Sequence, residues 1–303
     1  MKITEGRIPF RGHTTWYRIA GELEDPGRLP LLCLHGGPGS GWHHLESYEA
    51  LAAGRRVIFY DQLGCGNSAV DAPHDPGLWS VELYVEEVDA VRSALGLDRV
   101  VVLGQSWGGM LALSYALTQP PGLAGLVVQS SPASVPAWLE EIRRLRSELP
   151  AGVQAVLEAH EAAGTTADPA YEEAAMVFYR RHVCRTDPWP DWLQRTFGAM
   201  AANPEVYETM NGPSEFHVIG TIRDFDITGR LGEIRVPTLL ISGRHDEVTP
   251  ATVDRVHHAL PHSEWVLLEH SSHMAQAEQP DETLGALRRF LAHVEQHRPA
   301  ATV

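Results

Sequence analysis

A short run of apolar, mostly β-branched residues at 100–103 leads directly into the sequence Gly-Gln-Ser-Trp-Gly-Gly at 104–109. The residues that follow, 110–118, are predicted to form a helix. A serine between a strand and a helix, with glycines two positions away on either side, is typical of a nucleophile elbow, a strained turn that exposes the serine hydroxyl. The segment therefore predicts that Ser106 is a nucleophile and that the backbone N–H of Trp107 faces a developing oxyanion.

Strand and helix patterns alternate along most of the chain. Residues 6–21 read as two antiparallel strands joined near Gly12, and Ser80 is a candidate N-cap for the helix that follows it. Further strands are predicted at 30–34, 56–60, 100–103, 123–129, 236–242 and 264–268, and helices at 81–95, 110–118 and 282–294. Strands separated by helices favour a mostly parallel sheet. Together with the nucleophile elbow, which is typical of α/β-hydrolases, this alternation predicts an α/β-hydrolase fold with a central sheet of about eight strands.

The alternation lapses between residues 131 and 231. This stretch reads as helical or irregular, with aromatic residues placed among charged ones. We expect it to be a mainly helical cap inserted into a core that is formed by residues 1–130 and 232–303. A chain of 303 residues is somewhat long for one minimal α/β domain, which fits an insertion of this kind.

Composition restricts the classes of partner. The chain carries 39 acidic and 24 basic residues, a formal net charge of −15, which argues against nucleic acid or anionic membranes as partners. Residues 1–11 lack the apolar region of a secretory signal, and no apolar run approaches the ~20 residues of a membrane span. The three cysteines form no CxxC pair, and the histidines lack a metal-binding spacing such as HExxH. We expect a soluble, cytoplasmic protein without a metal or cofactor.

A serine nucleophile needs a histidine to take its proton and an acid to orient that histidine. In α/β-hydrolases the acid and then the histidine follow the serine in the sequence. Asp246 comes just after the strand at 236–242, and His273 lies in the loop after the next strand. These positions predict the triad Ser106, Asp246 and His273.

Two other residues compete for these roles. Asp226 is a second candidate acid, but it lies in the return from the cap and not after a sheet strand. His270 is a second candidate base, but it directly adjoins its strand, whereas a loop that carries His273 could reach over Ser106. Position therefore favours Asp246 and His273.

Six motifs together resemble the proline iminopeptidase family of α/β-hydrolases, which are serine aminopeptidases that release an N-terminal residue, often proline. The motifs occur in order through the core and the cap. They are HGGPGSG at 35–41, DQLGCGNS at 61–68, GQSWGG at 104–109, MNGPSEF at 210–216, GRHDEVTP at 243–250 and EHSSHM at 269–274.

The resemblance implies the same triad and adds further site residues. It implies an oxyanion hole formed by the backbone N–H groups of Gly37 and Trp107, and glycine at 37 would let a substrate approach the backbone closely. It also implies that Glu215 and Glu247 bind the amino terminus of the substrate, because a charged amine forms its stronger hydrogen bonds with carboxylates.

The leading hypothesis is a cofactor-independent serine aminopeptidase that releases an N-terminal residue, probably proline in view of the resemblance, from small peptides through an acyl-enzyme. An alternative is a hydrolase of amino-acid amides, esters or other small amine-bearing acyl compounds, which would use the same triad but act poorly on peptides. A third reading is a noncatalytic binding protein or a lyase on the same fold, because a fold does not determine function.

Overall fold

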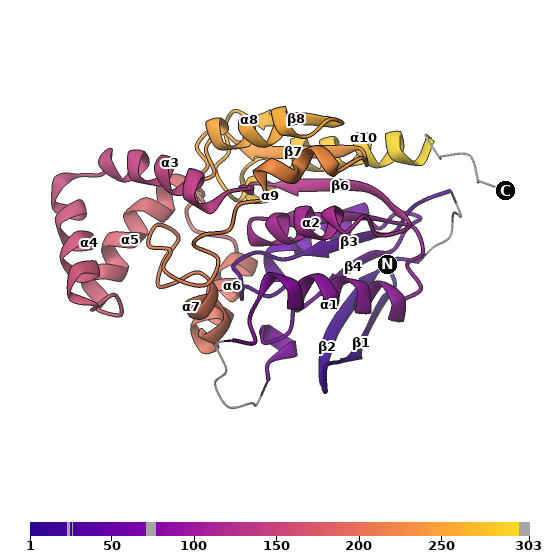
Figure 1. Cartoon of the computed structure of the whole chain (residues 1–303), viewed down its shortest axis with the longest axis horizontal. Coiled ribbons are helices and arrows are strands. Elements are labelled where there is room, and N and C mark those ends of the chain that lie inside the picture. Colours follow the sequence, from indigo (N-terminus) through magenta and orange to yellow (C-terminus); the bar gives the residue numbers. More distant parts are fainter. Residues whose placement is uncertain (23–24, 26, 71–76, 297–303) are drawn as a thin grey trace.

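The computed structural model describes residues 1–22, 25, 27–70 and 77–296 (Figure 1). Eight strands form one sheet in the order β1-β2-β4-β3-β5-β6-β7-β8. The pairs β1–β2 and β2–β4 are antiparallel, and the pairs from β4 to β8 along this order are parallel. The strands are β1 Ile3–Phe10, β2 His13–Ala20, β3 Leu31–Leu34, β4 Val57–Tyr60, β5 Val100–Gln105, β6 Leu123–Gln129, β7 Thr238–Gly243 and β8 Ser263–Leu268. The prediction of a mostly parallel sheet of about eight strands is confirmed.

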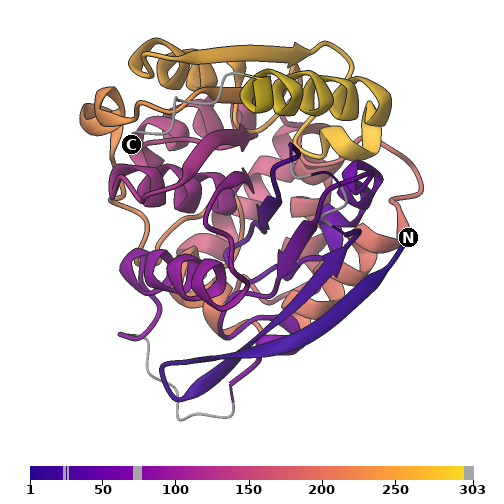
Figure 2. The ribbon, with the colours of Figure 1, turned by 90° about the vertical axis from the view of Figure 1, so that its right-hand side faces the viewer.

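The sheet is covered on both faces. Val102 of β5 lies in one hydrophobic core with α1 and α2, whereas its neighbours Val101 and Leu103 lie in a second core with η1 and α10. This alternation follows from the two-residue period of a strand and explains why the central strands are apolar throughout. Figure 2 shows the helices on the two sides of the sheet. The helices that cover it include α1 Val81–Ala94, α2 Trp107–Leu117, α8 Pro250–Ala259, α10 Pro280–Gln296 and the 3₁₀-helix η1 His43–Leu51.

A group of helices lies between β6 and β7 in the chain. Figure 1 shows these helices gathered at one end of the sheet. They are α3 Val135–Ser147, α4 Ala151–Ala163, α5 Pro169–His182, α6 Asp191–Ala202 and α7 Glu205–Met210. Their place fits the predicted cap, and we propose the boundaries 131–231 for it. The complementary core segment, 232–303, ends in residues 297–303, which lie outside the described residues.

Side-chain caps explain where several helices begin. The predicted N-cap Ser80 is confirmed, because its side chain accepts a hydrogen bond from the N–H of Leu83 in α1. Ser134 caps α3 in the same way, and Asp168 caps α5. No helix within the described ranges is long and apolar enough to cross a membrane.

Candidate active site

The predicted elbow is present between β5 and α2. Ser106 links the two elements with φ 57° and ψ −126°, a conformation that costs a non-glycine residue about 1–3 kcal/mol. A Cβ atom at Gly104 would lie 2.0 Å from the carbonyl oxygen of Gly108, and one at Gly108 would lie 2.1 Å from that of Leu34. The two glycines therefore let strand, turn and helix approach closely enough to hold Ser106 in this strained position.

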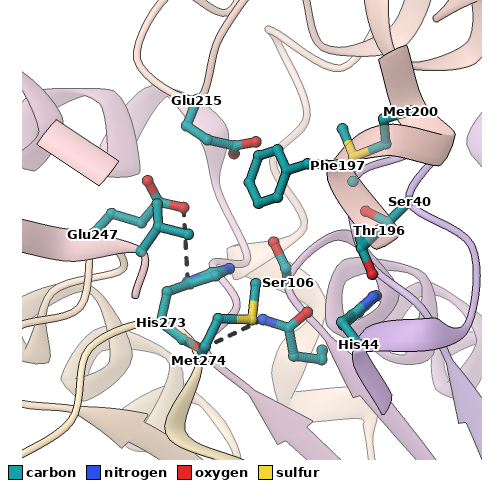
Figure 3. Close-up of a pocket in the computed structure, with 13 residues that line it drawn as sticks. Ser40, His44, Ser106, Thr196, Phe197, Met200, Glu215, Glu247, His273 and Met274 are labelled. Carbon is teal, nitrogen blue, oxygen red and sulfur yellow. Dashed lines mark hydrogen bonds and ion pairs between the residues drawn. The ribbon is translucent and has the colours of Figure 1, made fainter. Parts of the chain in front are cut away.

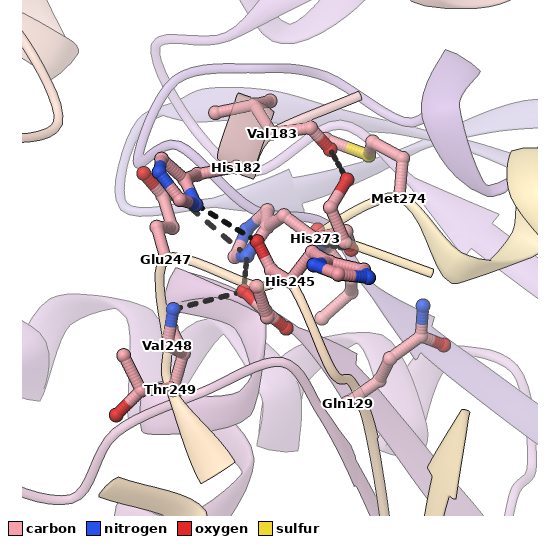
Figure 4. Close-up of polar contacts among 12 residues, drawn as sticks. Gln129, His182, Val183, His245, Glu247, Val248, Thr249, His273 and Met274 are labelled. Atoms are coloured by element: carbon pink, nitrogen blue, oxygen red, sulfur yellow. Dashed lines mark hydrogen bonds and ion pairs between the residues drawn. The ribbon is translucent and has the colours of Figure 1, made fainter. Parts of the chain in front are cut away.

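Asp246 and His273 lie in adjacent loops, after β7 and β8. The Nδ1 atom of His273 is 2.8 Å from Oδ1 of Asp246, and both side chains are buried. Figure 4 shows His273 together with Glu247 and Val248, which follow Asp246 in the chain. Asp246 Oδ1 also accepts a hydrogen bond from the backbone N–H of Val248 at 2.8 Å. The backbone N–H of His273 donates to the backbone carbonyl oxygen of His182 at 3.2 Å. These contacts hold the carboxylate against one ring nitrogen and leave Nε2 available to a nucleophile.

The competing residues lie in different surroundings. Asp226 pairs with Ser134 at the start of α3, where its Oδ2 accepts a hydrogen bond from the serine hydroxyl at 3.0 Å. His270 is exposed, and its backbone N–H donates to Gln279. Neither residue lines the pocket that contains Ser106 and His273.

One pocket brings together Ser106, His273, Gly37, Glu215 and Glu247 (Figure 3). It lies between the core loops and the cap. The residues that line it but were not singled out from the sequence are Ser40, His44, Gln105, Val183, Thr196, Phe197, Met200 and Met274. Val183 follows α5, and Thr196, Phe197 and Met200 lie on α6. These cap residues follow no motif, because their place at the pocket depends on how the cap helices pack over the core.

The two glutamates are held from behind by the cap. The hydroxyl of Tyr207 donates to Glu215 Oε1 at 2.7 Å. At Glu247 the backbone carbonyl accepts from the indole N–H of Trp138 at 3.1 Å, and the side chain is buried. Figure 3 shows both carboxylates directed into the pocket on the side away from Met274. The sequence alone gave no reason to single out Tyr207 or Trp138.

The site is electrostatically unusual. Burial raises the pKa of Glu215 above its ordinary value, although the Tyr207 hydroxyl opposes this shift. Burial and the nearby Glu215 raise the pKa of Glu247 well above its ordinary value. For His273, burial lowers the pKa, but the charges of Asp246 and the two glutamates outweigh it and raise the pKa to about 9. Strongly shifted groups gathered in one pocket are characteristic of functional sites.

The two predicted oxyanion donors come from different segments, the first glycine loop and the start of α2. Gly37 lines the pocket, and its φ of +107° lies in the region that favours glycine. Trp107 is the first residue of α2, so its N–H has no acceptor within the helix. The indole of Trp107 is buried, and its N–H donates to Gln62 Oε1 at 2.8 Å. The indole therefore contacts the second glycine loop, DQLGCGNS at 61–68.

The remaining residues of the two glycine loops support the backbone. His35 Nε2 accepts a hydrogen bond from the N–H of Gln62 at 2.9 Å, and Asp61 accepts from the N–H groups of Trp42 and Asn67, each at 2.8 Å. These contacts join the HGGPG loop to the DQLGCGNS loop. Cys65 is buried and does not line the pocket.

Comparison with known proteins agrees with this fold. A family model described as alpha/beta hydrolase fold matches residues 30–280. The proline iminopeptidase of Levilactobacillus brevis is 40% identical over 297 residues, which cover 96% of this chain and 97% of that protein. The proline iminopeptidase of Saccharolobus solfataricus is 39% identical over 280 residues, or 92% of this chain and 88% of that protein.

Two crystal structures are similar over nearly the whole chain. That of proline iminopeptidase from Mycobacterium smegmatis has a TM-score of 0.89 and 43% identity, and covers 97% of this chain and 99% of its own. That of VinJ has a TM-score of 0.93 and 44% identity, with 96% and 99% covered. The resemblance inferred from the six motifs is thereby confirmed, and the chain is a hydrolase that belongs to the proline iminopeptidase family of α/β-hydrolases.

Proposed function

We propose that this hydrolase is a serine aminopeptidase that releases an N-terminal residue, proline in the first place, from small peptides. The observation that carries the proposal is the common pocket of Ser106, His273 and the two buried glutamates, with His273 held by Asp246 at 2.8 Å. The names of relatives at about 40% identity over nearly the full length support the same activity.

In this proposal Ser106 is the nucleophile, His273 the general base and acid, and Asp246 the residue that orients the imidazole. The Oγ atom of Ser106 attacks the first peptide carbonyl and transfers its proton to His273 Nε2. The N–H groups of Gly37 and Trp107 donate to the oxyanion of the tetrahedral intermediate. His273 then protonates the departing amine, and water releases the N-terminal residue from Ser106 by the same steps in reverse.

Glu215 and Glu247 would confer the preference for a free amino terminus. An ammonium group placed between two carboxylates forms charge-assisted hydrogen bonds, which are about twice as strong as neutral ones. Burial, and then repulsion from Glu215, raise the pKa of Glu247 well above its ordinary value, so the pocket disfavours two ionised carboxylates when no cation is bound. An N-acylated substrate would bury these carboxylates without a cation, which is unfavourable.

We further propose that the enzyme works in the cytoplasm. Its three cysteines are all free, which fits a reducing compartment. The net charge of −15 supports small peptides or amino-acid derivatives, and not nucleic acids or anionic membranes, as its partners.

The test compares prolyl, alanyl and N-acetyl-prolyl anilides, with Ser106→Ala as the control variant. We expect release of the chromogenic amine from the free prolyl compound, and none from the acetylated compound or with the variant. If all three anilides resist cleavage while amino-acid esters are hydrolysed through Ser106, the enzyme is an amide or ester hydrolase of small amines. If Ser106 also fails to react with a fluorophosphonate, the noncatalytic or lyase reading replaces both.

A further inference from the structure

Glu247 contacts the proposed general base as well as the pocket. Its Oε1 lies 3.7 Å from Nδ1 of His273, the same nitrogen that lies 2.8 Å from Asp246. Its other oxygen, Oε2, is buried and has no hydrogen-bond partner among the described residues. The side chain that would bind a substrate amine is therefore also a charged neighbour of His273.

The charged and titratable groups that face His273 come from several elements. The loop after β7 contributes two carboxylates, the segment after α7 contributes a third, and η1 contributes a histidine. The groups are Asp246, Glu247, Glu215 and His44, whereas the imidazole of His182 is bound to the backbone carbonyl of His245. Burial lowers the pKa of His44 to about 3. This side chain is therefore neutral near neutral pH and adds no charge to the site.

We infer that Glu247, together with Glu215, makes the general base responsive to the charge of the substrate. A bound ammonium group neutralises the two carboxylates, drives one proton from the His273–Glu247–Glu215 cluster into solvent, and thereby frees His273 to accept the proton of Ser106. This inference rests on the proposed function, because it assigns a second effect to the proposed amine-binding residues.

The charges that surround His273 decide its protonation state. In the empty pocket the carboxylates favour a protonated imidazole, which is why the pKa of His273 is raised to about 9. A protonated imidazole cannot act as a base. A cation within about 4–6 Å lowers the pKa of an imidazole by about 1–3, which favours the neutral form. It also lowers the pKa of nearby carboxyl groups, which favours their ionised form. The extra proton can be held by any group of the His273–Glu247–Glu215 cluster, and in each case a bound ammonium group favours its release.

This coupling would make the amino group a requirement of the chemical step as well as of binding. A neutral ester that occupies the pocket leaves the cluster protonated, so its acylation is slow near neutral pH. The discrimination against N-acylated compounds would then be seen in kcat and not in KM alone.

The first test measures the pH dependence of kcat for acylation of Ser106 by a prolyl ester with a free amine and by its N-acetyl counterpart. We expect the rise of kcat with pH to lie at least about one unit lower for the free amine. In Glu247→Gln the two profiles should converge. Glu208→Gln, which removes an exposed carboxylate of α7, is the matched control and should leave the separation unchanged. Coincident profiles in the unmodified enzyme would overturn the inference.

A second test does not depend on turnover. Prolinamide binding to Ser106→Ala is followed by calorimetry at pH 7.5 in two buffers with different ionisation enthalpies. After the titration of the amine itself is subtracted, we expect the release of about half a proton to one proton. Binding without proton release would refute the coupling. If prolinamide binds with proton release but the unmodified enzyme cleaves no free prolyl anilide, the coupling is supported and the proposed aminopeptidase function is refuted.

Discussion

His273 Nδ1 lies 2.8 Å from Asp246 Oδ1 and 3.7 Å from Glu247 Oε1, so two carboxylates from consecutive positions compete for one ring nitrogen. Asp246 is the nearer, and it is fixed by the N–H of Val248. A neutral imidazole that donates from Nδ1 to Asp246 presents an unprotonated Nε2 to Ser106. The distances therefore favour Asp246 as the orienting residue.

Asp246→Asn tests this assignment. The amide can hold His273 in the wrong tautomer, so we expect kcat on the prolyl anilide to fall about 10⁴-fold while the fold is retained. Steady-state kinetics and circular dichroism would measure the two effects. A loss of less than about tenfold would mean that Glu247 orients His273 in place of Asp246.

Glu215→Ala is expected to separate the two classes of substrate. Loss of a charge-assisted hydrogen bond costs about 1.5–3 kcal/mol, so kcat/KM for free prolyl substrates should fall about 10- to 100-fold. Hydrolysis of neutral esters should change much less. The exposed Glu208→Ala serves as the control, and equal losses on both substrate classes would remove Glu215 from amine recognition.

A methyl group at Gly108 should destabilise the core. Its Cβ would lie 2.1 Å from the carbonyl oxygen of Leu34, so β3 or α2 must shift. We expect Gly108→Ala to lower the free energy of unfolding by about 1–3 kcal/mol or more, measured by urea denaturation. Gly152→Ala is the contrasting variant, because nothing lies within 4 Å of its added Cβ in helix α4. The free energy of unfolding of Gly152→Ala should rise by about 0.5–1 kcal/mol. A similar fall in the free energy of unfolding of both variants would contradict the steric explanation.

Glu87 predicts a pH dependence of stability. Its side chain is fully buried and accepts hydrogen bonds from Thr15 and from the N–H of Leu63, yet burial raises its pKa from 4.5 to about 8. The folded protein therefore holds a proton that the unfolded chain releases between these values. The stabilisation is complete below pH 4.5 and is lost as the pH rises through 8.

Glu87→Gln removes this titration. The free energy of unfolding of the variant, relative to the unmodified protein, should increase by on the order of 2–4 kcal/mol between pH 5 and pH 8.5. Urea denaturation at several pH values measures the difference. Parallel curves for the two proteins would show that Glu87 has the same protonation state when folded and unfolded.

Much of the fold followed from short-range patterns. The strand before Ser106, the glycines around it and the helix after it are adjacent in the chain, so their order predicted the elbow that the structure contains. The two-strand start at 6–21 and the break in alternation at 131 were equally local signals. The 3₁₀-helix η1, which brings His44 to the pocket, carried no such signal and was not predicted.

The sequence by itself determined the sheet, the elbow and the order of Ser106, Asp246 and His273, because strand period, turn glycines and motif order are properties of neighbouring residues. Only the tertiary structure decided that Glu215, from the cap, lies in one pocket with Glu247, and that Glu247 stands 3.7 Å from His273. These relationships depend on the packing of the cap helices over the core, which brings charges from distant segments together and shifts their pKa values through burial and mutual interaction.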